Sequence, residues 1–217
     1  MAESIKGLKR TDYCGKFDIS NVGQTITVFG WVQRQRDLGN LIFIDLRDRS
    51  GIIQLSFNDQ TDREIFAKAQ SVRSEYVVAA VGTVAERESK NHDIPTGEIE
   101  VIVNDFRIVS KAQTPPFEIE KSEKVGDEIT LKYRYLNLRN EKLTKNILMR
   151  HKIAKIAREY FYDNDFIEIE TPMMIKSTPE GARDYVVPSR VHNGKFYALP
   201  QSPQIYKQLT MIAGFDR

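Results

Sequence analysis

The sequence predicts an α+β protein in which a five-stranded β-barrel is followed by a hinge and by a second domain that begins with a long helix. Residues 25–109 consist of short segments with apolar residues at every second position, which is typical of half-buried strands. Residues 139–164 instead repeat apolar residues every three or four positions, as a helix does. Residues 111–127 contain a Pro-Pro pair and show no period. The predicted barrel domain, hinge and second domain are residues 1–110, 111–138 and 139–217.

The order of the elements in the first domain indicates the kind of barrel. The strand-like segments are residues 25–32, 41–47, 52–57, 76–84 and 98–109. A short helix is expected at residues 62–72, where Ile65, Phe66 and Ala69 recur at helical spacing. Three strands, one helix and two strands is the order of an OB-fold, a partly open five-stranded barrel. Other small barrels give a similar order, so the order alone does not select this fold.

The second domain is predicted to alternate between helices and strands. The helix at residues 139–164 carries Met149, Ile153, Ile156 and Tyr160 on one stripe. The further elements expected are a strand at 166–171, a strand at 195–199 and a helix at 202–213. Pro172 ends the first of these strands, and Gly214 follows the last helix as a stop signal.

The charge of the chain is balanced overall but uneven along the sequence. It has 217 residues with 32 Lys and Arg against 30 Asp and Glu, so no global basic field attracts nucleic acid. Residues 139–158, however, contain seven Lys or Arg and one acid, Glu141. This basic stretch is either a solvated helix face or a face that lies near a polyanion.

The cysteine and histidine content bounds the compartment and the chemistry. The single cysteine, Cys14, excludes an intramolecular disulfide and fits a reducing compartment. The three histidines lack the spacing of metal ligands, so no metal site is expected. Neither a signal peptide nor an apolar run of membrane-spanning length is visible. We therefore expect a cytoplasmic protein without a membrane partner.

Several polar and aromatic side chains point away from the predicted barrel core. The alternation in residues 41–47 turns Phe43 outward, and Gln54 has the same outward parity on the next strand. Arg34 and Arg36 follow the first strand-like segment. An outward ring either packs under a loop or a neighbouring domain, or stacks on an unpaired base, which is worth about 1–3 kcal/mol per base. Both readings of Phe43 stay open from the residues alone.

Longer strings then resemble a known family of enzymes. The strings GWVQRQRDLGNLIFIDLRDRSGIIQL (residues 30–55), TGEIEV (96–101) and LKYRYLNLR (131–139) resemble the anticodon-binding barrel of bacterial aspartyl-tRNA synthetases. The lysyl and asparaginyl enzymes share this barrel. FIEIETPMM (166–174) resembles motif 1 of the class II synthetases, whose helix and strand build a dimer interface. TPEGARDYVVPSR (178–190) and FYALPQSPQIYKQLTM (196–211) follow the aspartyl pattern.

This resemblance implies roles for individual residues. A pocket for L-aspartate is implied at Glu180, Ser202, Gln204, Ile205, Tyr206 and Lys207. Glu180 would face the substrate ammonium and Lys207 a substrate carboxylate. Contacts to the tRNA anticodon are implied at Arg34, Arg36, Phe43, Gln54, Asn91 and Glu100. Pro172 would lie in the dimer interface. Leu38 and Asn91 are similar to the form of the family that charges only tRNA-Asp.

The resemblance also implies partners and a reaction. The full-length enzyme would use ATP and Mg²⁺ to convert L-aspartate to aspartyl-adenylate, and would then transfer the aspartyl group to the 3′ end of tRNA-Asp. It would be a homodimer through motif 1, joining an OB-fold to an antiparallel-sheet catalytic domain. The match stops before motifs 2 and 3, which hold ATP, so we expect no catalytic residue, no tight ATP binding and no adenylation by these 217 residues. The alternative is a free-standing module that binds the tRNA anticodon without catalysis.

Overall fold

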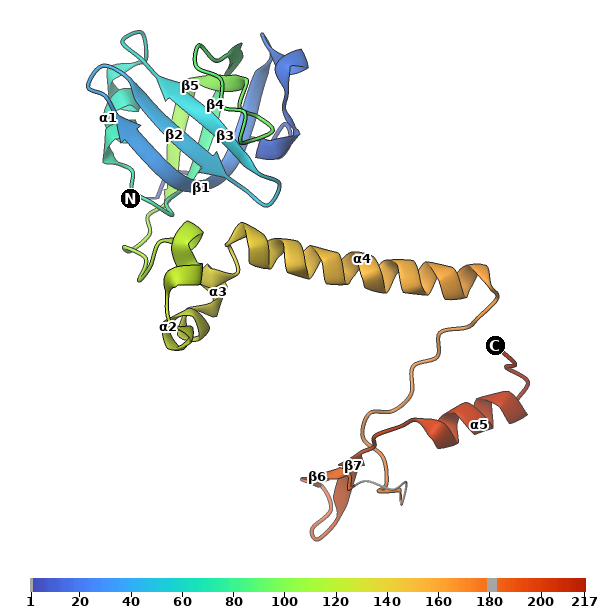
Figure 1. Ribbon diagram of the computed structural model, residues 1–217. Coiled ribbons are helices and arrows are strands. Elements are labelled where there is room, and N and C mark those ends of the chain that lie inside the picture. The colour runs from blue at the N-terminus through green and yellow to red at the C-terminus, as the bar shows by residue number, and fades with distance from the viewer. Residues whose placement is uncertain (1, 179–182) are drawn as a thin grey trace. The chain divides into compact units, whose positions relative to one another are not determined.

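The chain divides into two compact units in a computed structural model, which describes residues 2–178 and 183–217. The first unit is Met1–Asn140 and contains a β-barrel with a helical segment after it (Figure 1). The second unit is Glu141–Arg217 and consists of helices and a small hairpin.

Five strands close the barrel in the order β1-β2-β3-β5-β4 (Figure 1). The strands are β1 (Thr25–Asp37), β2 (Ile42–Arg47), β3 (Ile52–Phe57), β4 (Val77–Glu86) and β5 (Ile99–Ser110). All neighbours are antiparallel except β3 and β5, which pair in parallel. The helix α1 (Arg63–Ser71) lies between β3 and β4 in sequence. This confirms the predicted OB-fold.

Strict alternation along the strands separates the barrel core from its outer face. Along β2, Ile42, Ile44 and Leu46 are fully buried, while the residues between them are half-buried. Phe57 and Phe106 meet edge to face inside the barrel, with ring centroids 5.1 Å apart. Apolar burial of this kind is worth roughly 1.5–3 kcal/mol per large side chain and holds the outward residues in fixed positions.

Helix α1 closes one end of this core. Asp62 caps it by accepting hydrogen bonds from the backbone N–H groups of Glu64 and Ile65. Ile65 and Phe66 then pack against the buried cluster. Two short 3₁₀ turns precede β1 at Cys14–Lys16 and Ile19–Asn21.

Two glycines allow strands to cross closely. A Cβ on Gly30 would lie 2.4 Å from the carbonyl oxygen of Arg47, and one on Gly82 would lie 2.2 Å from that of Ile102. No side chain fits at such distances, so the barrel requires glycine at these places.

Strand β1 is longer than the sequence predicts. It continues to Asp37, with a register shift between Val32 and Arg34. Such an irregularity changes the side of the sheet to which the following side chains point. The alternation of apolar and polar residues therefore ends at this shift, although the strand continues. Arg34 and Arg36 therefore lie within a strand paired with β2, and not beyond its end.

Residues 111–140 are largely helical and are grouped with the barrel. They contain the 3₁₀ helix η3 (Ile119–Lys124), α2 (Asp127–Lys132) and α3 (Arg134–Asn137). Buried Asn140 joins them, because its side-chain amide donates to the carbonyl oxygen of Ile119 at 3.0 Å and to Oγ of Ser122 at 3.1 Å. We call residues 117–140 the linker segment.

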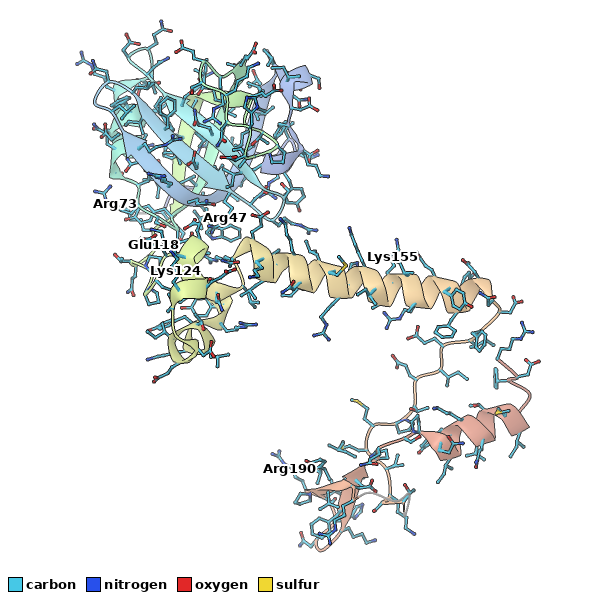
Figure 2. All side chains as sticks on the ribbon, in the orientation of Figure 1. Arg47, Arg73, Glu118, Lys124, Lys155 and Arg190 are labelled. Atoms are coloured by element: carbon cyan, nitrogen blue, oxygen red, sulfur yellow. The ribbon has the colours of Figure 1, made fainter. Side chains whose placement is uncertain are left out.

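The described residues of the second unit form four regular elements. They are α4 (Glu141–Asp163), β6 (Tyr185–Pro188), β7 (Phe196–Leu199) and α5 (Gln204–Ile212). The two strands pair as an antiparallel hairpin. Its strand β6 lies between the predicted strands at 166–171 and 195–199, where the sequence analysis expected no helix or strand. Figure 2 shows the side chains of α4 around the helix, and none of its residues is buried.

The strand predicted at residues 166–171 is not formed. In the described part of the chain, its backbone makes a hydrogen bond from Ile167 to the carbonyl oxygen of Arg217 but no ladder with another strand. Its alternating pattern is that of a strand, yet a strand needs a paired neighbour to form.

Candidate nucleic-acid interface

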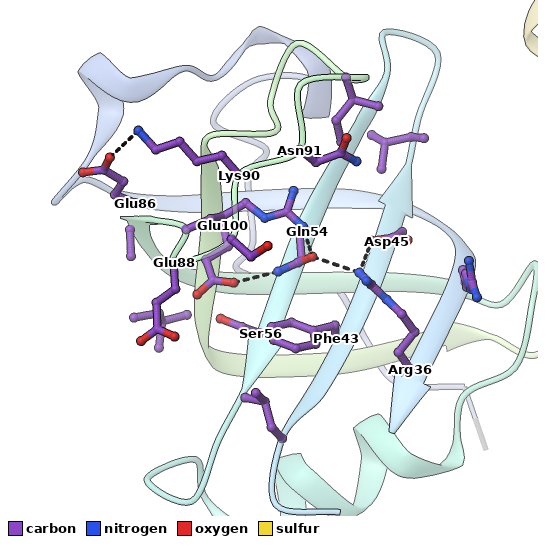
Figure 3. A pocket seen from close by; sticks show the side chains of 18 of the residues that line it. Arg36, Phe43, Asp45, Gln54, Ser56, Glu86, Glu88, Lys90, Asn91 and Glu100 are labelled. Carbon is purple, nitrogen blue, oxygen red and sulfur yellow. Dashed lines mark hydrogen bonds and ion pairs between the residues drawn. The ribbon is translucent and has the colours of Figure 1, made fainter. Parts of the chain in front are cut away.

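The outer face of the barrel has a cavity of about 830 Å³ (Figure 3). Residues from all five strands line it, together with the loop that follows β4. The six residues that the family resemblance implied as anticodon contacts all line this cavity: Arg34, Arg36, Phe43, Gln54, Asn91 and Glu100. The fold thus brings together positions that are up to 66 residues apart in sequence, from 34 to 100.

Strand register explains why these side chains meet. Arg36 on β1 pairs with Phe43 on β2, and Gln54 on β3 pairs both with Asp45 on β2 and with Glu100 on β5. Directly opposed residues on one sheet face have close Cβ atoms, so side chains from four strands converge. The parallel pairing of β3 and β5 is what adds Glu100.

Gln54 is the centre of a hydrogen-bond network on the cavity floor. Its side-chain oxygen accepts from Nη2 of Arg36 at 2.9 Å and from Nη2 of Arg87. Its amide nitrogen donates to Oε2 of Glu100 at 2.7 Å. Arg36 also donates to Oδ1 of Asp45 at 3.1 Å. Gln54 is only 4% exposed, so this network fixes the orientation of its amide.

Phe43 contributes an aromatic surface beside this network. Its ring is half-buried and does not belong to the barrel core. The guanidinium carbon of Arg36 lies 5.4 Å from the ring centroid, within the range of a cation–π contact. A planar ring held next to polar groups can stack on an unpaired base.

Arg87 is a cavity residue that the sequence analysis missed. It follows the end of β4, and its guanidinium donates to Gln54 and to the carbonyl oxygen of Gly97. Burial lowers the pKa of Arg87, and the carboxylates of Glu100 and Asp45 oppose that effect. Both neighbours of Arg87 in sequence are glutamates, so no alternation of apolar and polar residues indicates that its side chain faces the cavity.

The loop that carries Asn91 is held by backbone contacts. The N–H of Asn91 donates to the carbonyl oxygen of Gly97 at 2.9 Å, and its side-chain oxygen accepts from the N–H of Asp93 at 3.0 Å. A Cβ on Gly97 would collide with the carbonyl oxygen of Asn91. The loop is therefore folded tightly at the rim of the cavity.

The charges of the lining are mixed. Cations and carboxylates both occur there: Arg34, Arg36, Arg87, Lys90, Asp45, Glu86, Glu88 and Glu100. Lys90 is paired with Glu86 at 2.7 Å, whereas Nε of Arg36 and Nε of Arg87 are buried without a hydrogen-bond partner among the described residues. Buried donors without partners cost stability. The cavity therefore offers donors, acceptors and a stacking ring, which is the chemistry that reads unpaired bases.

The residues implied for L-aspartate lie in the second unit. Gln204 and Lys207 are exposed and three positions apart on α5, so they share one face of that helix. Ser202 and Tyr206 are half-buried and Ile205 is exposed. Glu180 lies outside the described residues. Among the described residues, Ser202, Gln204, Ile205, Tyr206 and Lys207 line neither the barrel cavity nor a second cavity of about 680 Å³ formed by residues between Ala154 and Glu168.

Pro172 lies after α4, exposed and outside any helix or strand. Among the described residues, no group of three or more His, Cys, Asp or Glu side chains is arranged to hold a metal ion. The described part of the chain also contains no helix with the length and apolar character needed to cross a bilayer.

Two family descriptions match separate parts of the chain. "OB-fold nucleic acid binding domain" matches residues 26–109, which is the barrel. "tRNA synthetases class II (D, K and N)" matches residues 126–217.

Relatives with similar sequences carry synthetase names. The chain is 58% identical to "Aspartate--tRNA ligase" of Ruminiclostridium cellulolyticum and 57% identical to "Aspartate--tRNA(Asp/Asn) ligase" of Caldanaerobacter subterraneus. Each match covers 100% of this chain and 37% of the relative. The chain therefore spans little more than a third of the length of these relatives.

Solved structures show the same fold. Asparaginyl-tRNA synthetase from Pyrococcus horikoshii, complexed with asparaginyl-adenylate, matches with a TM-score of 0.80 at 25% identity, over 96% of this chain and 46% of that one. A putative aspartyl-tRNA synthetase from Leishmania major matches with a TM-score of 0.84 at 23% identity, over 99% and 44%. With its barrel, its class II match and its 58% identity to a named relative, the chain is similar over its whole length to a part of the aspartate–tRNA ligases.

Proposed function

We propose that the barrel binds the anticodon loop of tRNA-Asp, as the anticodon-reading part of an aspartate–tRNA ligase. The observation that carries this proposal is the convergence, on one cavity of the barrel, of the six residues that the family resemblance implied as anticodon contacts. The names of the relatives support the choice of aspartate and tRNA as substrates.

The side chains of the cavity suggest different roles in RNA binding. The ring of Phe43 would stack on an unpaired base, which contributes about 1–3 kcal/mol. Gln54 and Glu100 would meet base edges, because an amide donates and accepts while a carboxylate only accepts. Arg34 would contact phosphate oxygens, which positions the RNA without reading its sequence.

The second unit would supply part of the amino-acid site of the complete ligase. We propose that Glu180, Ser202, Gln204, Ile205, Tyr206 and Lys207 bind L-aspartate. Lys207 would pair with a substrate carboxylate. ATP and Mg²⁺ would bind to parts of the complete ligase other than the described residues. The complete enzyme would form aspartyl-adenylate and then aspartyl-tRNA.

We also propose that the complete ligase is a cytoplasmic homodimer that pairs through the segment containing Pro172. Large apolar residues on α4, including Ile153 and Ile156, are exposed to solvent. Such exposed apolar surface supports the proposal of a protein–protein interface in this unit. The free, buried thiol of Cys14 fits a reducing compartment. A barrel that works alone without catalysis is the less favoured function, because the class II match covers residues 126–217.

Specificity between tRNA-Asp and tRNA-Asn is a finer part of the proposal. Leu38 is 70% exposed in the turn between β1 and β2, and Asn91 lies at the cavity rim. Both suit direct contact with an anticodon loop. We propose that the chain discriminates in favour of tRNA-Asp, although relatives of similar identity carry both kinds of name.

Binding of an anticodon stem-loop by the 217-residue chain tests the proposed function. A tRNA-Asp stem-loop should bind more tightly than an RNA duplex of equal length and charge, because a duplex offers no unstacked bases. The measurement is fluorescence anisotropy at one fixed salt concentration, since phosphate contacts alone change affinity with salt. Equal affinity for both RNAs would refute base reading by the barrel.

A further inference from the structure

An ion-pair cluster around a buried carboxylate lies in the first unit, and its three residues do not line the cavity. It joins Arg47 at the end of β2, Glu75 in the turn before β4, and Arg139 at the end of the linker segment. Figure 2 labels Arg47 at the edge of the barrel, where it also approaches Glu120 of η3, with 3.7 Å between Nη1 and Oε1. None of these residues belongs to the proposed anticodon or aspartate contacts.

The barrel itself sets the position of Glu75. Its N–H donates to the carbonyl oxygen of Val32 at 2.7 Å, and the N–H of Val32 donates to the carbonyl oxygen of Tyr76 at 2.8 Å. These bonds hold the turn against β1. Glu75 also has a φ of 66°, which is unusual for a residue with a side chain and persists only where the surroundings enforce it.

The carboxylate of Glu75 is almost completely enclosed. Its side chain is 3% exposed, against 12% for Arg47 and 28% for Arg139. Nη2 of Arg47 donates to both carboxylate oxygens, at 2.8 and 2.9 Å, and Nη1 of Arg139 donates to Oε2 at 2.5 Å. A buried carboxylate is tolerated when it is paired and hydrogen-bonded in this way. Removing one partner leaves the others with unmatched charge.

Arg139 is held by a second contact with the barrel. Its guanidinium carbon lies 4.8 Å from the ring centroid of Trp31 on β1. A stacked guanidinium with a charged partner has a fixed position, which the point charge of a lysine does not reproduce. Arg139 comes two residues before α4 begins at Glu141, so this contact fixes the end of the linker segment on the barrel.

The same strand carries both the cavity groups and the cluster. Phe43, Asp45 and Arg47 alternate along β2 and share its outer face. Phe43 and Asp45 line the cavity, and Arg47 holds Glu75. Strand β2 therefore carries side chains that a ligand in the cavity would contact, and it also carries Arg47, which pairs with Glu75.

We propose that Glu75 is a positioning residue that links strand β2 to the linker segment through Arg47 and Arg139. RNA bound in the barrel cavity would then reduce the local opening of residues 117–140. This proposal rests on the proposed function in its second half, the response to RNA. Its first half, the attachment of the linker segment to the barrel, stands without RNA.

Hydrogen exchange of the 217-residue chain tests the attachment first. In Arg139→Met without RNA, backbone amides of residues 117–140 should exchange about tenfold faster than in the unchanged protein, because a hydrogen bond to a charged group is lost. Amides of β1 and β4 should keep their protection, which shows that the barrel is folded. Arg134→Met, at an exposed arginine of the same segment, is the matched control and should leave the rates unchanged. Equal rates in Arg139→Met and Arg134→Met would overturn the attachment.

The same measurement with a saturating tRNA-Asp anticodon stem-loop tests the response. In the unchanged protein, RNA should slow the exchange of residues 117–140 by about fivefold or more, which is within the usual range for coupling between two sites. In Arg139→Met and in Glu75→Gln the slowing should fall below about twofold while RNA stays bound. Bound RNA without slowing in the unchanged protein, or full slowing in Arg139→Met, would overturn the response. If the stem-loop does not bind at all, the proposed function and the response both fail, and the exchange rates without RNA still decide the attachment.

Discussion

Replacing Phe43 by alanine removes an aromatic ring from the lining of the barrel cavity while leaving the barrel core intact. The ring is half-buried, and it is not one of the residues that form the buried cluster. The change therefore separates a role in RNA binding from a role in folding. A core phenylalanine would cost about 3–5 kcal/mol of stability on truncation to alanine.

The expected loss of affinity follows from the stacking that Phe43 can provide. One base on an aromatic ring is worth about 1–3 kcal/mol, which corresponds to a rise in Kd of about 5- to 150-fold. Arg36 already lies 5.4 Å from the ring centroid, so a stacked base must use the other face or displace this cation. We expect the free energy of unfolding to fall by less than about 1 kcal/mol, as is usual for residues outside the core.

The assay is the affinity of the tRNA-Asp anticodon stem-loop at several salt concentrations, with urea unfolding of each variant. Phe29→Ala is a matched control, because Phe29 is also half-buried, carries the guanidinium of Arg10 at 5.4 Å, and does not line the cavity. Phe29→Ala should change Kd by less than about twofold. Phe43→Ala should leave the slope of affinity against salt unchanged, because no phosphate contact is removed.

Unchanged affinity in Phe43→Ala, with the variant folded, would refute the stacking role. An equal loss in Phe29→Ala would also refute it, since that result would indicate a general effect of truncating barrel aromatics. Phe43→Leu adds a further check, because it keeps apolar bulk without a ring and should recover only part of the affinity.

Three further predictions concern other parts of the chain. Gln54→Leu should weaken stem-loop binding at least about tenfold and lower the urea midpoint, because the buried amide serves three charged partners and each such bond is worth about 1.5–3 kcal/mol. Burial raises the pKa of Glu3, but hydrogen bonds from Lys68 and from the N–H of Ile108 outweigh burial and lower that pKa. The Glu3–Lys68 ion pair therefore stabilises the fold at neutral pH, by less than about 1 kcal/mol because both side chains are partly exposed. This stabilisation is lost as the pH falls through the lowered pKa of Glu3. The difference in unfolding free energy between the unchanged protein and Glu3→Gln should accordingly shrink from pH 6 to about pH 3, and a constant difference would contradict it. The 217-residue chain should show no aspartate-dependent pyrophosphate exchange, because Gln204 and Lys207 are exposed and line neither the barrel cavity nor the cavity between Ala154 and Glu168. Clear turnover would contradict this expectation.

The sequence was sufficient for the barrel because its strands alternate strictly around a buried core. Alternation in β2 and β3 gave both the strands and the outward direction of Phe43 and Gln54. Arg87 was missed because its place depends on the loop after β4 and on a partner 33 positions away, which no local period records. The full length of β1 was missed because a register shift interrupts its alternation.

The second unit shows the opposite limit of sequence patterns. The long helix was predicted within two residues at its start, because its apolar period is regular. The strand expected at residues 166–171 has the right alternation but no paired neighbour in the described chain. The aspartate contacts rest on the family resemblance, since Gln204 and Lys207 by themselves look like ordinary residues of an exposed helix.

The central claim, that the barrel cavity reads the anticodon of tRNA-Asp, is tested most directly by exchanging the bases of the RNA. Affinity should be measured for the tRNA-Asp stem-loop and for stem-loops that differ from it by one anticodon base each. At constant salt, each replacement should weaken binding by about 1–3 kcal/mol, roughly 5- to 150-fold. The same affinity for all of these stem-loops would show that the cavity binds RNA without reading it, and would contradict the claim.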